Sequence, residues 1–229
     1  MLNKDTRAIL KSLIPINNSM IIEPVMHGAD EYKSLLFRAK LNEIEDDIQE
    51  FGIFDTSSFL SSLDLLEDAV ISFADNRITA ADANSTLTFI TSDISALEDI
   101  AIKPSVIDTT LKVDSIVEFG FGSELLARIK KASGVFKTFD TLFIINDGNS
   151  IQLKMGTKDS FSKSNNSFAI SVDSDVNTGK EFELALPLES ISKIPAMNYT
   201  FHVKYNEDKD AYRVVLDNTL LTFVMSLMR

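Results

Sequence analysis

Residues 4–14 have the sequence KDTRAILKSLI, which has the spacing of an amphipathic helix. Its apolar residues fall on one side of such a helix, whereas Lys4, Arg7 and Lys11 recur at i, i+3 and i+7 on another side. Pro15 ends the run. The stretch therefore predicts a helix that buries one face and presents a cationic face.

A second helix of this kind is predicted at residues 123–133. Arg128, Lys130 and Lys131 lie off its apolar face, and Lys137 follows its end. Because the formal net charge is −12, clustering of cations on two corresponding helices favours a shared face for a polyanionic partner. The alternative interpretation is that these are ordinary basic residues on solvated helix faces.

The negative charge is concentrated in the first half of the chain. Residues 1–110 contain 8 Lys and Arg against 19 Asp and Glu, whereas residues 111–229 contain 14 against 15. Much of the excess lies in the run 43–50, which we interpret as a solvated loop or strand face. A divalent-metal cluster is the alternative, but the run lacks the Asp/Asn-Gly pattern of an EF-hand loop.

The remaining pattern repeats one plan twice: helix, strands, helix, meander. Two further helices are predicted at 57–67 and 188–194. Strands are predicted at 19–25, 34–41, 52–54, 69–73, 77–81, 85–90, 142–146, 151–155, 167–172, 181–186, 199–205, 212–216 and 220–226. We therefore expect an α+β chain of two similar domains, each with two helices backed by antiparallel sheets.

The junction between the two domains is predicted within residues 95–111, where Pro104 interrupts the pattern. We place the domains at residues 1–108 and 109–229. The two halves share negligible residue identity, so the repeat is one of structural order.

The composition excludes several classes of chemistry. The chain of 229 residues has no cysteine, which removes disulfides, thiolate nucleophiles and Cys-based metal sites. His27 and His202 lie in different halves, and Gly120 with Gly122 is only a fragment of a glycine fingerprint. We predict no catalytic residue, no metal site and no cofactor. No segment has the apolar length of a membrane span or a secretory signal, so a cytoplasmic protein is expected.

Three stretches resemble the sliding clamps of T4-like bacteriophages. They are residues 2–11 (LNKDTRAILK), 54–60 (FDTSSFL) and 78–86 (ITAADANST). The similarity runs along most of the chain and is fainter at 125–133 and 193–199. This resemblance implies two clamp-type domains per subunit and three subunits in a closed ring.

The resemblance implies a DNA polymerase processivity factor that is not an enzyme. Such a ring encircles duplex DNA without reading its sequence and tethers the replicative DNA polymerase during viral DNA synthesis. An ATP-dependent clamp loader opens it, transcription factors are possible further partners, and the location is the cytoplasm of the infected bacterial host. The residues then expected to face DNA are Lys4, Arg7, Lys11, Arg128, Lys130, Lys131, Lys137 and Lys193.

The resemblance also implies an apolar outer pocket for partner peptides near the domain junction. Candidate lining residues are Ile100, Ile102, Val106, Val224 and Met225, although a place in the core or an interface is the favoured interpretation for each. A competing hypothesis for the whole chain is an acidic two-domain structural or adaptor protein of a virus particle, which would not stimulate a polymerase.

Overall fold

The computed structural model describes residues 2–41, 50–74, 76–158 and 166–228. All four predicted helices are confirmed, and α3 is an additional helix that the sequence pattern did not predict. The helices are α1 (Lys4–Leu13), α2 (Thr56–Leu63), α3 (Pro104–Leu111), α4 (Ser123–Val135) and α5 (Leu188–Lys193), with 3-10 turns η1 (Ile94–Leu97) and η3 (Glu207–Lys209).

Antiparallel strands form the remaining regular structure of the described residues, as predicted for an α+β chain. Those of the first half are β1 (Met20–Ile22), β2 (Val25–Ala29), β3 (Leu35–Lys40), β4 (Phe51–Ile53), β5 (Val70–Ala74), β6 (Arg77–Ala81) and β7 (Thr86–Ile90). Those of the second half are β8 (Ser115–Phe121), β9 (Thr141–Asn146), β10 (Ile151–Gly156), β11 (Phe168–Val172), β12 (Val176–Asn177), β13 (Phe182–Pro187), β14 (Tyr199–Asn206), β15 (Ala211–Asp217) and β16 (Leu221–Met225).

Several details of the predicted elements were wrong. Strand β12 was not predicted, and of β2 only Val25 lies in a predicted strand. The predicted strand 19–25 is interrupted before β2 begins, because Pro24 has no N–H to donate to a strand ladder. The predicted helix 57–67 ends at Leu63, after which Asp64 caps it. Strand β8 was missed because its Gly120 was interpreted as part of a loop motif. The acidic run 43–50 lies outside the described residues, apart from Glu50.

The two halves repeat the same order of elements, as the sequence predicts. In the first half β1 pairs with β4, β2 with β3, and β5, β6 and β7 form a meander. In the second half β9 pairs with β13, β10 with β11, and β14, β15 and β16 form the meander. The predicted domain boundary after residue 108 falls inside α3, the helix that connects the halves.

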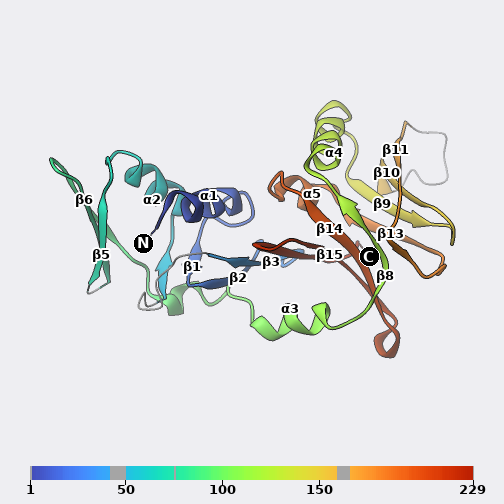
Figure 1. Cartoon of the computed structure of the whole chain (residues 1–229), viewed down its shortest axis with the longest axis horizontal. Coiled ribbons are helices and arrows are strands. Elements are labelled where there is room, and N and C mark those ends of the chain that lie inside the picture. Colours follow the sequence, from blue (N-terminus) through green and yellow to red (C-terminus); the bar gives the residue numbers. More distant parts are fainter. Residues whose placement is uncertain (1, 42–49, 75, 159–165, 229) are drawn as a thin grey trace.

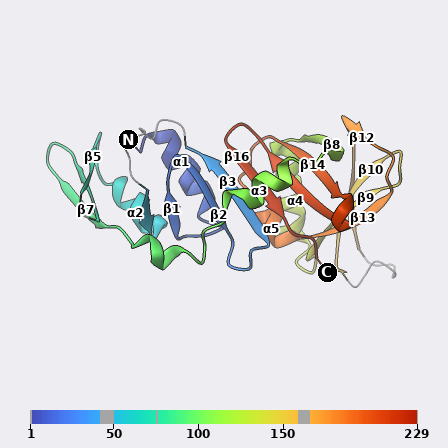
Figure 2. The same cartoon turned by 90° about the horizontal axis from the view of Figure 1, so that it is seen from below.

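One seven-stranded sheet crosses from one half to the other. Its strand order is β12-β8-β14-β15-β16-β3-β2, so β16 of the second half pairs antiparallel with β3 of the first. Phe223 lies opposite Phe37 in this register, and these side chains are 0% and 2% exposed. The pairing gives the chain a continuous core and an elongated shape with a meander at one end (Figures 1 and 2).

The helices lie on two sides of this sheet. Figure 1 shows α1, α2, α4 and α5 on one side and α3 on the other. The sheet residues alternate accordingly: Phe37 and Phe223 belong to the main core under the four helices, whereas Val215 and Val224 pack against Ile107 of α3. We call the side with the four helices the helical face and the side with α3 the outer face.

Candidate nucleic-acid interface

The helix α1 presents cations because its other face is buried. Asn3 caps it, its Oδ1 accepting a hydrogen bond of 2.7 Å from the Thr6 backbone N–H. The core-facing residues are Thr6, Ile9, Leu10 and Leu13, so Lys4 projects into solvent and Arg7 is half-buried. The Arg7 Nε donates to the Leu2 carbonyl at 2.9 Å, which orients the guanidinium at the start of the helix.

Lys11 has a counter-charge on the neighbouring helix. Its Nζ lies 2.6 Å from Oδ2 of Asp64 at the end of α2, and both side chains are about half exposed, at 47% and 49%. Lys4, Arg7 and Lys11 line a groove of about 640 Å³ beside Asp64 and Asp68. The positive potential of α1 is therefore strongest at Lys4 and Arg7 and weaker at Lys11.

The helix α4 repeats this arrangement in the second half. Leu126, Ile129 and Ala132 are buried, whereas Arg128, Lys131 and Lys137 are exposed. Helix α4 lies on the helical face, as α1 does (Figure 1).

Lys130 has a different environment from its neighbours on α4. Its Nζ donates to the Ile194 carbonyl at the end of α5, and burial lowers the pKa of the ammonium group. Lys130 thus connects the two helices of the second half.

Lys193 is also held by the protein. Its Nζ lies 2.8 Å from Glu189 and 3.9 Å from Asp30, a carboxylate that is 4% exposed in the β2–β3 hairpin. Asp30 accepts hydrogen bonds from the backbone N–H groups of Ser34 and Leu35. The Lys193 ammonium group therefore lies where α5 of the second half meets the β2–β3 hairpin of the first half.

The predicted cations lie on helices of the helical face, or directly after one of them, in two groups (Figure 1). The first group is on α1, and the second is on α4, beyond its end and on α5. Lysine and arginine side chains placed this way attract phosphates without reading bases. The sequence pattern found these residues, but the partners Asp64, Ile194 and Asp30 come from distant positions that no local spacing reveals.

The five candidate pocket residues are not brought into one cavity. Met225 is fully buried in the main core, and Val224 is 4% exposed beneath α3, positions that match the core interpretation. Ile100 lines a small cavity with His27, of about 10 Å³. Ile102 precedes α3 and is half-buried. Val106 alone of the five lines a larger groove on the outer face.

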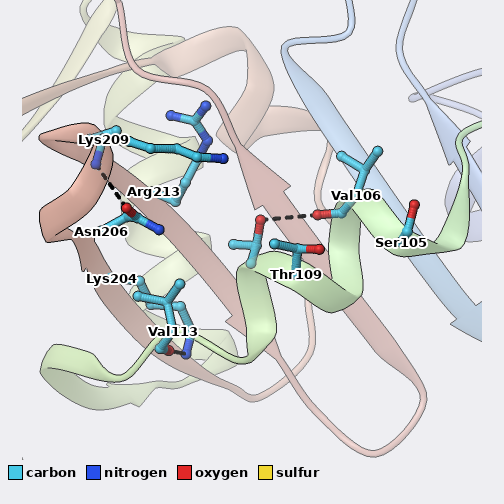
Figure 3. Close-up of a pocket in the computed structure, with 10 residues that line it drawn as sticks. Ser105, Val106, Thr109, Val113, Lys204, Asn206, Lys209 and Arg213 are labelled. Atoms are coloured by element: carbon cyan, nitrogen blue, oxygen red, sulfur yellow. Dashed lines mark hydrogen bonds between the residues drawn. The ribbon is translucent and has the colours of Figure 1, made fainter.

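That outer groove lies between α3 and the hairpin of β14 and β15 (Figure 3). Its volume is about 390 Å³, and it is lined by Ser105, Val106, Thr109, Thr110, Val113, Lys204, Asn206, Lys209, Ala211 and Arg213. Sequence reasoning missed it because its walls come from two segments far apart in the chain. The local feature that could have indicated the groove is the spacing of Lys204 and Asn206, which lie two residues apart on one strand and so on the same face of it.

The histidines do not form a catalytic or metal arrangement with other ligands in the described structure. Nδ1 of His202 lies 3.2 Å from Glu118 and 3.1 Å from Ser115 Oγ, and burial lowers the pKa of the ring. Burial likewise lowers the pKa of His27. Within the described residues no three His, Asp or Glu side chains group as metal ligands. The same residues contain no helix of the length and apolarity needed to span a membrane.

Comparison with known proteins identifies a curated relative. The chain is 29% identical over 187 residues to the protein called "Sliding clamp" of Vibrio phage KVP40, covering 79% of this chain and 81% of that protein. No family model matches the sequence.

Solved structures show the fold. The PCNA of Thermococcus kodakaraensis superimposes with a TM-score of 0.70 at 12% identity, covering 98% of this chain and 96% of that one. The PCNA of A. fulgidus, solved with the C-terminal region of FEN-1 bound, gives a TM-score of 0.65 at 11% identity, covering 97% and 94%.

The repeated halves, the helical face and these likenesses define the molecule as a DNA sliding clamp. The similarity to the Vibrio phage protein indicates which kind of sliding clamp the sequence is similar to. The sequence of the chain is similar to that of a bacteriophage sliding clamp, as the resemblance predicted.

Proposed function

We propose that this clamp closes as a ring of three subunits around duplex DNA and tethers the replicative DNA polymerase of a phage. The observation that carries the proposal is the shared placement of α1, α2, α4 and α5 on one side, with exposed cations on α1 and α4 (Figure 1). In a closed ring that face lines the hole. Phosphate contacts from such cations are independent of sequence, which suits a ring that slides.

The strand pairing at the joint between the halves, β16 with β3, is a model for how neighbouring subunits would pair in a ring. There, β16 ends the second meander and pairs antiparallel with β3, the second strand of a hairpin. By the internal repeat, β7 corresponds to β16, and β11 corresponds to β3. Both β7 and β11 are edge strands, and they lie in opposite halves of the chain. Antiparallel pairing of β7 with β11 of the next subunit would close a head-to-tail ring.

The exposure of apolar side chains supports this pairing. At the internal joint Phe37 and Phe223 are 2% and 0% exposed. Leu87 and Phe89 of β7 and Ile170 of β11 occupy comparable core-facing positions but are only partly buried. An approaching edge strand would cover them, so ring closure would add apolar burial of the kind already present between the halves.

The partners follow from the clamp assignment. The A. fulgidus clamp is bound to a segment of FEN-1, which supports docking of replication proteins on this chain as well. We propose that it acts without catalysis, that a separate ATP-dependent loader opens the ring, and that it works in the cytoplasm of the infected bacterium. Phage transcription factors are a further class of partner that we propose.

The first test is the solution mass by light scattering over a concentration series. The ring predicts about three times the subunit mass of 25.4 kDa. A monomer at every concentration up to about 100 μM, far above the dissociation constant of a useful interface, would contradict the encircling mechanism.

A second test concerns DNA. The clamp loaded on nicked circular DNA should stay bound at salt concentrations that remove it from the same DNA once linearised, because a ring slides off free ends. Equal loss from both forms would contradict topological retention.

A further inference from the structure

Lys11 and Lys130 occupy the same position in the two halves of the chain. Lys4 begins α1 and Ser123 begins α4, so each of the two lysines lies seven residues after the first residue of its helix. The helix α1 packs against α2, and α4 packs against α5 (Figure 1). Each lysine therefore reaches from the first helix of its pair to the end of the second.

The groups that hold these two lysines differ in charge. Lys130 Nζ donates to the backbone carbonyl of Ile194 at the C-cap of α5. Lys11 Nζ donates at 2.6 Å to Oδ2 of Asp64 at the C-cap of α2. The carboxylate of Asp64 therefore neutralises the lysine of the first half, whereas the carbonyl of Ile194 has no net charge to compensate that of Lys130.

The groove beside α1 contains charges of both signs. It is lined by Lys4, Arg7 and Lys11 together with Asp64 and Asp68, and its volume is about 640 Å³. Both carboxylates are exposed. Charges that lie closer together than the Debye length, about 10 Å at 0.1 M salt, are only partly screened. A phosphate that approached Lys11 would therefore be repelled by Asp64 beside it.

The exposed cations of α4 and its end have no such acidic partners. Arg128, Lys131 and Lys137 form no ion pair with any carboxylate in the part of the chain that the structure describes. The two halves of the helical face therefore offer phosphates unequal electrostatic attraction, although both carry exposed cations.

We propose that Asp64 limits the affinity of the first half for duplex DNA by holding Lys11 away from the phosphates. Each subunit then attracts the duplex more strongly through α4 than through α1. An exposed ion pair is weak, so a phosphate can take Lys11 from Asp64, but it must then lie beside an unpaired carboxylate. The inference rests on the proposed function in that DNA passes along the helical face. It adds a positioning residue that opposes DNA contact, which suits a ring that topology retains and that must slide.

The first test removes the carboxylate. The full chain is titrated against a short fluorescein-labelled linear duplex, and fluorescence anisotropy gives the affinity at several salt concentrations. Asp64→Asn keeps the size of the side chain but not its charge, so the affinity at low salt should rise by about threefold, the size expected for an exposed ion pair. The slope of log affinity against log salt should become steeper by about 0.9 for each phosphate that a released Lys11 binds.

The matched control makes the same change of charge away from the helical face. Asp99 is an exposed carboxylate between η1 and α3. Asp99→Asn should leave both the affinity for the duplex and its salt slope unchanged.

A second set of variants tests whether Asp64 acts through Lys11. Lys11→Gln should weaken binding to the duplex less than Lys131→Gln, because Lys11 is held by a carboxylate and Lys131 is exposed on α4. This comparison does not depend on the folding of the Asp64 variant. In the Lys11→Gln background, Asp64→Asn should no longer make the salt slope steeper, which separates restraint of Lys11 from simple repulsion of DNA by the carboxylate.

Four outcomes would overturn the proposal. They are an unchanged affinity and slope in Asp64→Asn, an equal rise in Asp99→Asn, a loss in Lys11→Gln as large as that in Lys131→Gln, and a slope that steepens equally in the Lys11→Gln background. The solution mass of Asp64→Asn and its retention on nicked circular DNA report on the ring separately. If both match the unmodified protein while the affinity is unchanged, the ring stands and the role of Asp64 fails.

Discussion

At the scale of single residues, the cations of the helical face differ in their surroundings, because some project into solvent and others are bound by groups of the protein. Lys4, Arg128, Lys131 and Lys137 project into solvent, whereas Lys130 contacts a carbonyl of the protein itself. Residue type and helical spacing were enough to find these cations. They could not predict the roles of Lys130 and Lys193, since these depend on tertiary contacts.

Charge reversal tests the helical face directly. We expect Arg7→Glu combined with Arg128→Glu to reduce loading on DNA and polymerase processivity while the solution mass is unchanged. For each phosphate that the variant no longer binds, the slope of log affinity against log salt should become shallower by about 0.9. The matched control is Lys40→Glu with Lys112→Glu, exposed cations away from the four helices. Normal processivity in the Arg7 and Arg128 variant would contradict the assignment of the channel.

The histidine His202 gives a prediction about pH. Burial lowers its pKa from the usual 6.5, so the unfolded chain binds the proton more readily than the folded one. The stability associated with neutral His202 is therefore present above pH 6.5 and is lost as the pH falls through the lowered folded value. The melting temperature should fall between pH 7.5 and pH 5.5, and it should fall less in His202→Gln. An identical fall in the variant would contradict this account.

At the scale of elements, periodic segments were predictable and interrupted ones were not. The helices α1 and α4 each bury a full apolar stripe, which is the signal that spacing detects. Helix α3 buries only Ile107, and its Pro104 was interpreted as a break in the pattern. Proline is in fact favourable in the first turn of a helix, where its missing N–H has no partner to lose.

The cap of α1 gives a prediction at this scale. Asn3→Ala removes the side-chain oxygen that accepts the hydrogen bond of the Thr6 N–H, which should cost about 1 kcal/mol of unfolding free energy. For a chain of this size the melting temperature should fall by about 2–4 °C. Asn3→Asp keeps an acceptor at the cap and should retain nearly all the stability. A similar loss in both variants would show that the cap is not the cause.

At the scale of the whole molecule, the order of elements was predictable but the sheet that joins the halves was not. The repeat of helix, strands, helix and meander follows from local patterns. The pairing of β16 with β3 depends on residues nearly the full chain apart, and the sequence carries no local record of their register. The clamp assignment required the sequence relationship and the complete fold.

Ring closure can be broken at one strand. Leu87→Asp places a charge at the partly buried face of β7, where we expect the next subunit to dock. The variant should lose the trimer and sediment as a folded monomer, with an unchanged far-ultraviolet circular dichroism spectrum. Leu65→Asp is the matched control, because Leu65 is 81% exposed just beyond α2 and off the edge strand. A stable trimer in Leu87→Asp would place the interface elsewhere.

The internal joint has a consequence for how such a ring opens. A closed trimer would contain six strand joints of similar construction, but the three within subunits are also linked covalently through α3. A linker of this kind holds its two ends at a high effective concentration, on the order of millimolar for short connections. A ruptured internal joint would therefore re-form before its strands could drift apart. The three joints without a tether are the only ones that dilution can keep open, so any gate for DNA lies between subunits.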